Sequence, residues 1–349
     1  MERSSLATGA AVLAIIGALW TADLFLARTE NRETREEAER AYETGTRLLK
    51  ANLPGEAVDQ FRKAYALDRE NPRYQLQLAA GLIAAGKTGE AETMLSDILA
   101  LSPNNGEANL LEARLMAREG KAADATSYYH RAIYGIWNID ALSRRVQVRL
   151  ELADFLARTG SDKELLAELL PLETEAHDLA TRKQVAHLYL LANSPARSAA
   201  LYRTLIREDP RDKSDYAGLG EAELVLGSYR TAEMAFRSAG AEDRAELAQH
   251  VAALDPTPRN LSAADKTERS IDVLRAVREA LARCAADDPK LTQADELLSK
   301  KIRTATNAEA EDRLDLAAEL WDERTQRCGA SSSPDEEALR LVMAKLANR

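Results

Sequence analysis

Alanines recur at a fixed interval in the first half of this chain, and that interval constrains the fold more than any other feature. Ala57, Ala91 and Ala125 are 34 residues apart. A large side chain follows each alanine after four residues, and a small or branched apolar one after three more. These pairs are Phe61 and Ala64, Leu95 and Ile98, and Tyr129 and Ala132. Another small residue lies twelve positions before each alanine: Gly45, Ala79 and Ala113.

This spacing predicts pairs of antiparallel helices that stack on one another. Residues four apart share one helix face, and two helices approach closely only where the facing positions are small. The loops between the paired helices read ANLPGEA, AGKTGEA and REGKAADA. We expect the glycine in each to take the left-handed conformation that ends a helix. One pair cannot bury its apolar stripe alone, so neighbouring pairs must pack together.

The pattern resembles the tetratricopeptide repeat, whose consensus is W-x2-L-G-x2-Y…A-x3-F…P over 34 residues. The first repeat reads AYETGTRLLKANLPGEAVDQFRKAYALDRENP and the second YQLQLAAGLIAAGKTGEAETMLSDILALSP, both without the leading Trp. The resemblance implies a right-handed superhelical solenoid that binds protein segments in a concave groove. Five or six units are predicted over residues 41–245, irregular around 133–178, where about six extra residues follow YYHRAIYGIWN.

Composition agrees with an all-α chain. Ala, Leu, Glu and Arg dominate, and aromatic residues make up only 5%. Unbranched side chains lose little rotamer freedom in helices, so this mixture favours them. The formal net charge of −10 argues against nucleic acid as a partner, because a phosphate-binding surface needs positive charge.

The C-terminal region, residues 255–349, is predicted to be helical without a clean repeat. Helices are expected near 265–286, 291–304 and 308–328, followed by a capping helix over 334–347. Ser333 is the expected N-cap of that last helix, with Pro334 at its first position and Glu336 completing a capping box.

The N-terminal residues 1–27 are predicted to anchor the chain in a membrane. The run from Leu6 to Ala27 is apolar except for Asp23, and is long enough to cross the hydrocarbon core. A cleaved signal peptide or a buried helix is the alternative. Residues 28–40 have no apolar stripe and are expected to form a polar stalk.

The arginines after the span and the number of cysteines both bear on the membrane orientation. Arg28 and the arginines that follow it favour a cytoplasmic domain by the positive-inside rule, but long domains cross largely regardless of charge. An even cysteine count favours the extracytoplasmic, periplasmic side. Cys284 and Cys328 are either free thiols or one disulfide. They are expected at the same end of a three-helix layer, with Cα atoms within about 7 Å if bonded.

No catalytic, metal or cofactor motif is recognisable. The four histidines form no HExxH pattern, and there is no GxSxG or phosphate-binding glycine loop. We therefore predict no enzyme activity, no cofactor, no metal and no small-molecule substrate. The alternative is an unrecognised active site within residues 262–349.

In the tetratricopeptide repeat family, the first helix of each unit lines the concave groove. The resemblance therefore implies that the partner-binding residues lie on the first helix of several units. They are Tyr42, Leu49, Arg73, Leu76, Ile83, Leu110, Arg114, Arg118, His187 and Leu190. Arg114 and Arg118 lie one helical turn apart, and guanidinium groups bind carboxylates well, so they are expected to contact acidic groups of the partner. The alternative is that they pair with Glu107 or Glu112.

The aromatic run of Tyr128, Tyr129, Tyr134 and Trp137 is either core packing around the inserted turn or a hydrophobic docking site. Together, these features predict a protein-interaction scaffold or assembly factor of the cell envelope, held at a membrane by its N-terminal helix. A secreted soluble repeat protein is the further alternative.

Overall fold

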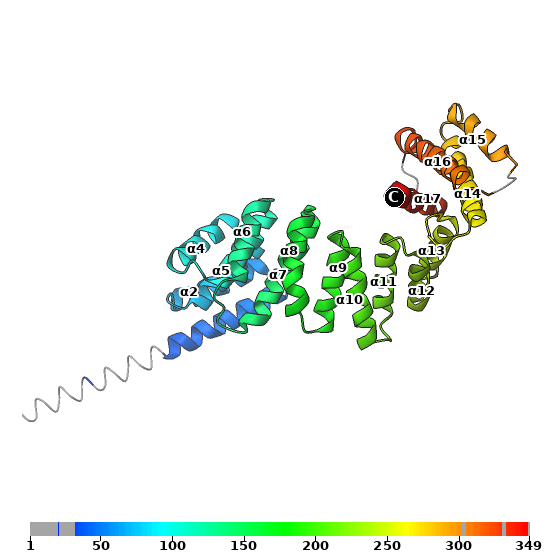
Figure 1. Cartoon of the computed structure of the whole chain (residues 1–349). Helices are drawn as coiled ribbons and strands as arrows, with labels where there is room; N and C mark the ends of the chain where they lie inside the picture. Colours follow the sequence, from blue (N-terminus) through cyan, green and yellow to red (C-terminus); the bar gives the residue numbers. More distant parts are fainter. Residues whose placement is uncertain (1–19, 21–31, 302–304, 330–332, 348–349) are drawn as a thin grey trace, which may run out of the picture. The chain divides into compact units, whose positions relative to one another are not determined.

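The computed structural model describes residues 20, 32–301, 305–329 and 333–347. Regular structure within these residues is helical, apart from one isolated bridge between Asn105 and Ile136. The prediction of an all-α chain is confirmed. The chain divides into two compact units, with the boundary between Thr159 and Gly160 (Figure 1).

The first unit is built from consecutive helices that pack side by side. They are the helix over residues 32–50, α2 (Pro54–Leu67), α3 (Pro72–Ala84), α4 (Thr88–Leu101), α5 (Gly106–Arg118), α6 (Ala122–Ile133) and α7 (Ala141–Thr159). The periodic alanines and the large residues after them are buried, including Ala57, Phe61, Ala91 and Leu95 at 0% exposure. These residues form one continuous apolar core with Leu76, Ala79, Leu82 and Ala108 of the inner helices.

Phe61 shows why the repeat needs small residues at fixed positions. A methyl group added to Gly45 would lie 2.7 Å from the Phe61 ring, and one added to Gly81 would lie 2.9 Å from it. The ring therefore packs directly on the backbone of two neighbouring helices. Phe236 repeats the arrangement in the second unit, where a methyl group on Gly220 would lie 2.6 Å from the ring.

Replacing Gly45 with Ala should lower the free energy of unfolding by about 1–3 kcal/mol, because the added methyl group overpacks the core against Phe61. Gly55→Ala is the matched control. Gly55 lies in the first turn of α2 with no atom within 4 Å of the added methyl group, so this change should be neutral or stabilise the helix. Thermal melting of both variants checks the prediction, and equal effects would contradict it.

In two of the three turns between paired helices, a glycine has the predicted left-handed conformation. Gly86 and Gly120 both have φ of +74°. In the first loop, however, Asn52 has the left-handed conformation, with φ of +60°, and Gly55 already belongs to α2. The expectation for Gly55 was wrong. Asparagine tolerates the left-handed region better than other residues with a Cβ atom, so it replaces glycine there.

The packed array begins before residue 41. Ala38 is fully buried and Glu39 accepts a hydrogen bond of 2.9 Å from the Tyr74 hydroxyl. The end of the predicted polar stalk, 28–40, is therefore part of the folded unit. The sequence predicts a longer stalk because a single buried residue, Ala38, makes no visible apolar stripe.

The predicted membrane span, Leu6–Ala27, lies outside the described residues except for Trp20. In the part of the chain that the structure describes, no helix combines the length and the apolar character needed to cross a membrane.

The second unit contains the remaining helices. They are α8 (Asp162–Glu175), α9 (Leu179–Leu191), α10 (Pro195–Glu208), α11 (Lys213–Val225), α12 (Tyr229–Ala239), α13 (Glu242–Leu254), α14 (Ala263–Ala282), α15 (Lys290–Ser299), α16 (Asn307–Arg327) and α17 (Pro334–Ala347). One apolar cluster joins α11 to α17 through residues such as Phe236, Val251, Val277, Leu320 and Val342.

Ser333 is the N-cap of α17, as predicted, and accepts the backbone N–H of Glu336 at 3.3 Å. The Glu336 carboxylate also accepts hydrogen bonds from Arg283 and Arg324. The two arginines lie far from Glu336 in the sequence, so local pattern reasoning could not identify them.

Candidate partner-binding groove

A pocket of about 760 Å³ opens in the first unit, beside the point where the repeat register breaks. Tyr42 of the first helix, Arg73 and Leu76 of α3, and Glu107 of α5 contribute to its lining. Ile136, Trp137 and Ile139 of the α6–α7 connection, and Arg144 of α7, contribute to the rest. We call this space the insertion pocket. It combines the family's inner-helix positions with residues that the regular repeat does not have.

Backbone hydrogen bonds hold the α6–α7 connection against the start of α5. The N–H of Ile136 donates to the carbonyl oxygen of Asn104 at 2.7 Å, and the N–H of Gly106 donates to the carbonyl oxygen of Ile136 at 3.0 Å. Two glycines permit this approach. A methyl group on Gly135 would lie 2.8 Å from the Cα atom of Gly106, and one on Gly106 would lie 2.5 Å from the Trp137 ring. These contacts fix the position of the α6–α7 connection, which forms one wall of the pocket.

Four large apolar side chains of this segment face solvent. Tyr134 is 73% exposed, Ile136 68%, Ile139 80% and Leu142 76%. We call these four residues the insertion ridge. Large apolar side chains clustered on a surface are typical of an interaction site, whereas scattered ones are not. The predicted aromatic run thus divides, because Tyr129 is buried in the core and Tyr134 is exposed.

Two arginines bring positive charge to the insertion pocket. Arg73 lies over the Tyr42 ring at 4.1 Å and pairs with Glu39 at 3.2 Å. Arg144 is exposed and forms no ion pair within the residues that the structure describes. An arginine beside apolar side chains can bind a carboxylate through charge-assisted hydrogen bonds. Arg144 is the group in this pocket that is free to do so.

The structure gives the predicted Arg114 a different role. Its guanidinium group donates two hydrogen bonds of 2.8 Å to the carboxylate of Glu151 on α7, and the Tyr129 hydroxyl donates a third at 2.9 Å. The hydrogen bonds that Arg114 donates to Glu151 hold the pKa of Arg114 above its usual value. Burial alone would raise the pKa of Glu151, but the hydrogen bonds from Arg114 and Tyr129 lower it. The partner of Arg114 is thus Glu151, and neither Glu107 nor Glu112.

Arg114→Ala should therefore lower the free energy of unfolding by about 1 kcal/mol, because Glu151 and the Tyr129 hydroxyl lose a partner at a half-exposed site. Arg145→Ala removes an exposed arginine of α7 and should change stability by less than about 0.5 kcal/mol. Chemical denaturation of both variants makes the comparison. Equal stability would mean that the ion pair with Glu151 contributes nothing.

The other predicted groove residues are dispersed. Arg118 donates a hydrogen bond of 3.0 Å to the carbonyl oxygen of Ile83, which ties α5 to α3. Leu76, Ile83 and Leu110 are each only 6% exposed, and of these Leu76 lines the insertion pocket.

Three further positions complete the comparison. Leu49 is half-buried at the packed seam of the first repeats. His187 is exposed and Leu190 half-buried, and both belong to the second unit. The insertion pocket therefore contains Tyr42, Arg73 and Leu76 from the predicted set.

In the α6–α7 connection, sequence reasoning named Tyr134 and Trp137 as part of a possible docking site, and it missed the residues around them. The signal was present as a break in the 34-residue period, in which Ile136, Ile139 and Leu142 lie close together without a helical period. A periodic pattern assigns the residues that repeat, so an insertion between repeats receives no role from it. Arg144 has no repeat position for the same reason.

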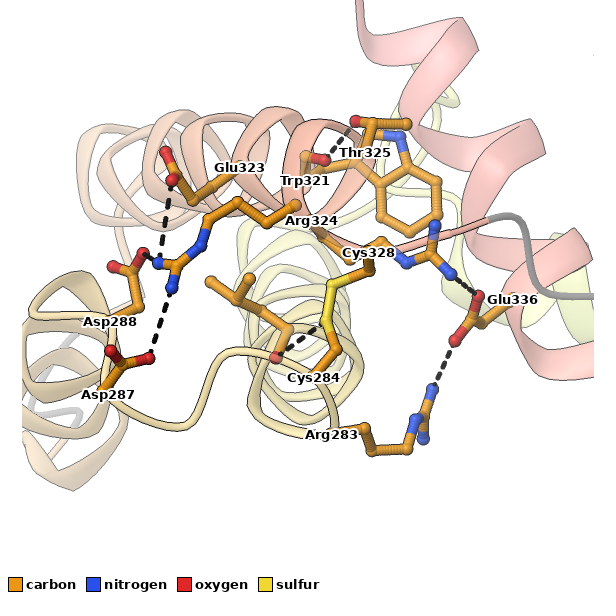
Figure 2. The surroundings of a disulfide bond; sticks show 12 residues. Arg283, Cys284, Asp287, Asp288, Trp321, Glu323, Arg324, Thr325, Cys328 and Glu336 are labelled. Carbon is orange, nitrogen blue, oxygen red and sulfur yellow. Dashed lines mark hydrogen bonds and ion pairs between the residues drawn. A yellow bond between two sulfur atoms is a disulfide. The ribbon is translucent and has the colours of Figure 1, made fainter.

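The two cysteines are joined in a disulfide, with their Cα atoms 5.9 Å apart. Cys284 follows the end of α14 and Cys328 follows the end of α16, so the bond links the same end of two adjacent helices (Figure 2). No cluster of side chains suited to a metal ion occurs among the described residues.

The comparisons agree with this architecture. The tetratricopeptide repeat model matches residues 48–115 and 82–134. A comparison with curated proteins gives no match. Among solved structures, a tetratricopeptide repeat protein of Parabacteroides merdae is 15% identical, with a TM-score of 0.42, over 88% of this chain and 99% of that one.

Two other solved structures are similar at the same level. The C-terminal part of a repeat-containing protein of Cytophaga hutchinsonii is 10% identical, with a TM-score of 0.45, over 83% of this chain and 100% of that one. A thermophilic repeat protein of Thermus thermophilus is 16% identical, with a TM-score of 0.36, over 54% and 99%. The family model thus identifies tetratricopeptide repeats at residues 48–134 of the chain.

Proposed function

We propose that this protein is an interaction scaffold or assembly factor that binds a segment of a partner protein in the insertion pocket and on the insertion ridge. Tetratricopeptide repeat proteins are in general interaction scaffolds that use extended surfaces for binding. The observation that carries the proposal for this chain is the exposure of Tyr134, Ile136, Ile139 and Leu142 beside a pocket of about 760 Å³. Exposed apolar area of this kind is costly in water unless a partner covers it.

The chemistry of the pocket indicates the kind of segment that fits. Ile136 and Ile139 offer apolar contacts for one large side chain, and the unpaired Arg144 offers a partner for a carboxylate. A peptide with an apolar anchor and a nearby acidic group complements both. In this proposal Arg114 and Arg118 support the fold of the groove, and the partner contacts Arg144 and Arg73.

A binding experiment with designed variants tests this assignment. Peptides of 12 residues are selected from a random display library on the full chain, and their affinities are measured by fluorescence anisotropy. Ile139→Asp and Arg144→Glu should each weaken binding by about 10-fold or more, as expected for central contacts of an interface. Both side chains are exposed, so folding should be unaffected.

Met234→Asp is the control, since Met234 is an apolar side chain of α12 that is 62% exposed in the other unit. It should bind the peptides like the unmodified chain. Peptides without acidic residues, or peptides that bind Ile139→Asp at full affinity, would contradict the proposed site.

We further propose that the scaffold is held at a membrane by residues 6–27, with its folded part on the extracytoplasmic side. The apolar run in the sequence supports the anchor. The disulfide supports an oxidising compartment, because such bonds are rare in reducing ones. The full chain should resist alkaline extraction from membranes and retain residues 1–27. A mature chain that begins after residue 27 would identify a signal peptide instead.

A further inference from the structure

The disulfide of the second unit lies at an exposed turn. Cys284 is an exposed residue after α14, and Cys328 is half-buried after α16. Thiol–disulfide exchange requires that a thiolate reach one sulfur atom of the bond, so accessibility decides which disulfides are reducible in the folded protein. The exposed turn at Cys284 is the side from which a dithiol donor would reach the bond.

The residues next to this bond bind one carboxylate of α17. Arg283, which precedes Cys284, donates a hydrogen bond of 2.9 Å to Oε1 of Glu336. Arg324, one turn before Cys328, donates to the other oxygen of Glu336. Figure 2 shows the carboxylate between the two guanidinium groups, with the disulfide between their helices. Glu336 is only 7% exposed, and a buried carboxylate is stable only while its charge partners remain in place.

Helix α17 also has polar contacts that do not involve Arg283 or Arg324. Arg244 donates a hydrogen bond of 2.9 Å to Glu337, and the Tyr229 hydroxyl donates one of 3.2 Å to the carbonyl oxygen of Leu341. Lys345 donates to the Asp255 carboxylate and to the Gly227 carbonyl oxygen, both at 2.7 Å. Ala338, Leu339 and Val342 pack into the apolar cluster of this unit. Helix α14, in contrast, packs along the whole of α16. Opening the disulfide should therefore leave α14 and α16 together and weaken mainly the first turn of α17.

We propose that Cys284–Cys328 is a site of thiol–disulfide exchange whose opening loosens the N-terminal part of α17. The thiolate of a dithiol donor attacks Sγ of Cys284, the S–S bond breaks, and Cys328 leaves as a thiolate that takes a proton from water. The donor's second thiol then attacks the mixed disulfide and releases Cys284. The donor loses two electrons and becomes a disulfide, and the protein gains two thiols. Arg283 and Arg324 are then no longer held at a fixed spacing around Glu336.

Hydrogen exchange measured by mass spectrometry on the folded full chain tests this proposal. Dithiothreitol at neutral pH is the donor, and alkylation followed by mass measurement counts the thiols. Reduction should produce two thiols and raise the exchange rate of amides in α17 by about 10-fold or more, with α9 and α10 unchanged. A bond that dithiothreitol opens only in denaturant would overturn the proposal.

Two variants distinguish a disulfide that controls the mobility of α17 from one that only stabilises the fold. The double variant Cys284→Ser, Cys328→Ser should show fast exchange in α17 without dithiothreitol and no response to it. Glu336→Gln keeps the disulfide and should also raise exchange in α17, because the charge that binds the two arginines is lost. Unchanged exchange in α17 in either variant, or faster exchange throughout α8–α17 on reduction, would show that the disulfide does not control this helix.

Discussion

Replacing Cys284 and Cys328 with serine is expected to lower the free energy of unfolding of the α14–α17 part of the second unit by about 4 kcal/mol, the largest effect of any change considered. The disulfide closes a loop with a sequence separation of 44 residues, and such a cross-link removes conformational entropy from the unfolded chain. The two helices that it joins pack on each other, so α14 and α16 should stay together in the native state of the variant.

Urea unfolding provides the measurement, followed by the fluorescence of Trp321 on α16 with the other two tryptophans replaced by Phe. The oxidised chain should have the higher midpoint, and the reduced chain and the serine variant should agree with each other. A difference below about 1 kcal/mol would mean that the closed loop contributes little beyond the packing of α14 on α16.

A pH dependence of the first unit's stability is the second large effect that we expect, and it arises from Glu112 of α5. This side chain is 6% exposed, and burial raises its pKa to about 7, with further contributions from Glu92 and Glu119. In the unfolded chain the pKa returns to about 4.5. The folded state therefore binds more protons between these values, and stability falls as pH rises from about 4.5 to 7.

The loss should reach about 2–3 kcal/mol above pH 7, because each unit of pKa difference corresponds to about 1.4 kcal/mol. Glu112→Gln removes the titrating group and should be more stable than the unmodified chain at pH 8, with little difference at pH 4. Glu107→Gln, an exposed glutamate of the same helix, is the control and should keep the original pH dependence. Urea unfolding at several pH values measures the free energy of unfolding of each variant. The same pH dependence in the unmodified chain and in Glu112→Gln would contradict the prediction.

The sequence predicts the architecture because the architecture is repetitive. The four-residue spacing of Ala57 and Phe61, and the small residue Gly45 before them, describe one packing unit, and the structure places the Phe61 ring on that glycine. Each repeat solves the same packing problem with the same residue sizes, so the pattern is visible without any tertiary information. The repeat at residues 48–134 and the all-α class were predictable for this reason.

The candidate site was predictable only in part, because its polar contacts join residues that are distant in the sequence. The position of Arg114 on an inner helix follows from the repeat. Its partner Glu151, however, is 37 residues away, on a helix in the region where the repeat pattern is irregular. Pattern reasoning could place the arginine on the groove face, and it could not show that the guanidinium group was already occupied. Tyr42, Arg73 and Leu76 were found since they occupy regular positions of the first repeats.

Site-specific photo-crosslinking tests the central claim, that the insertion ridge and pocket bind a partner protein, most directly. A photoreactive phenylalanine analogue is placed at residue 136, 139 or 142 in one set of chains, and at residue 226 or 234 in the control set. All five positions carry exposed apolar side chains, so the substitutions should leave the fold intact. Irradiation in the native host should give a discrete protein adduct from the first set, which Arg144→Glu weakens, and none from the second. Adducts that form equally from both sets, or from the control positions alone, would contradict the account.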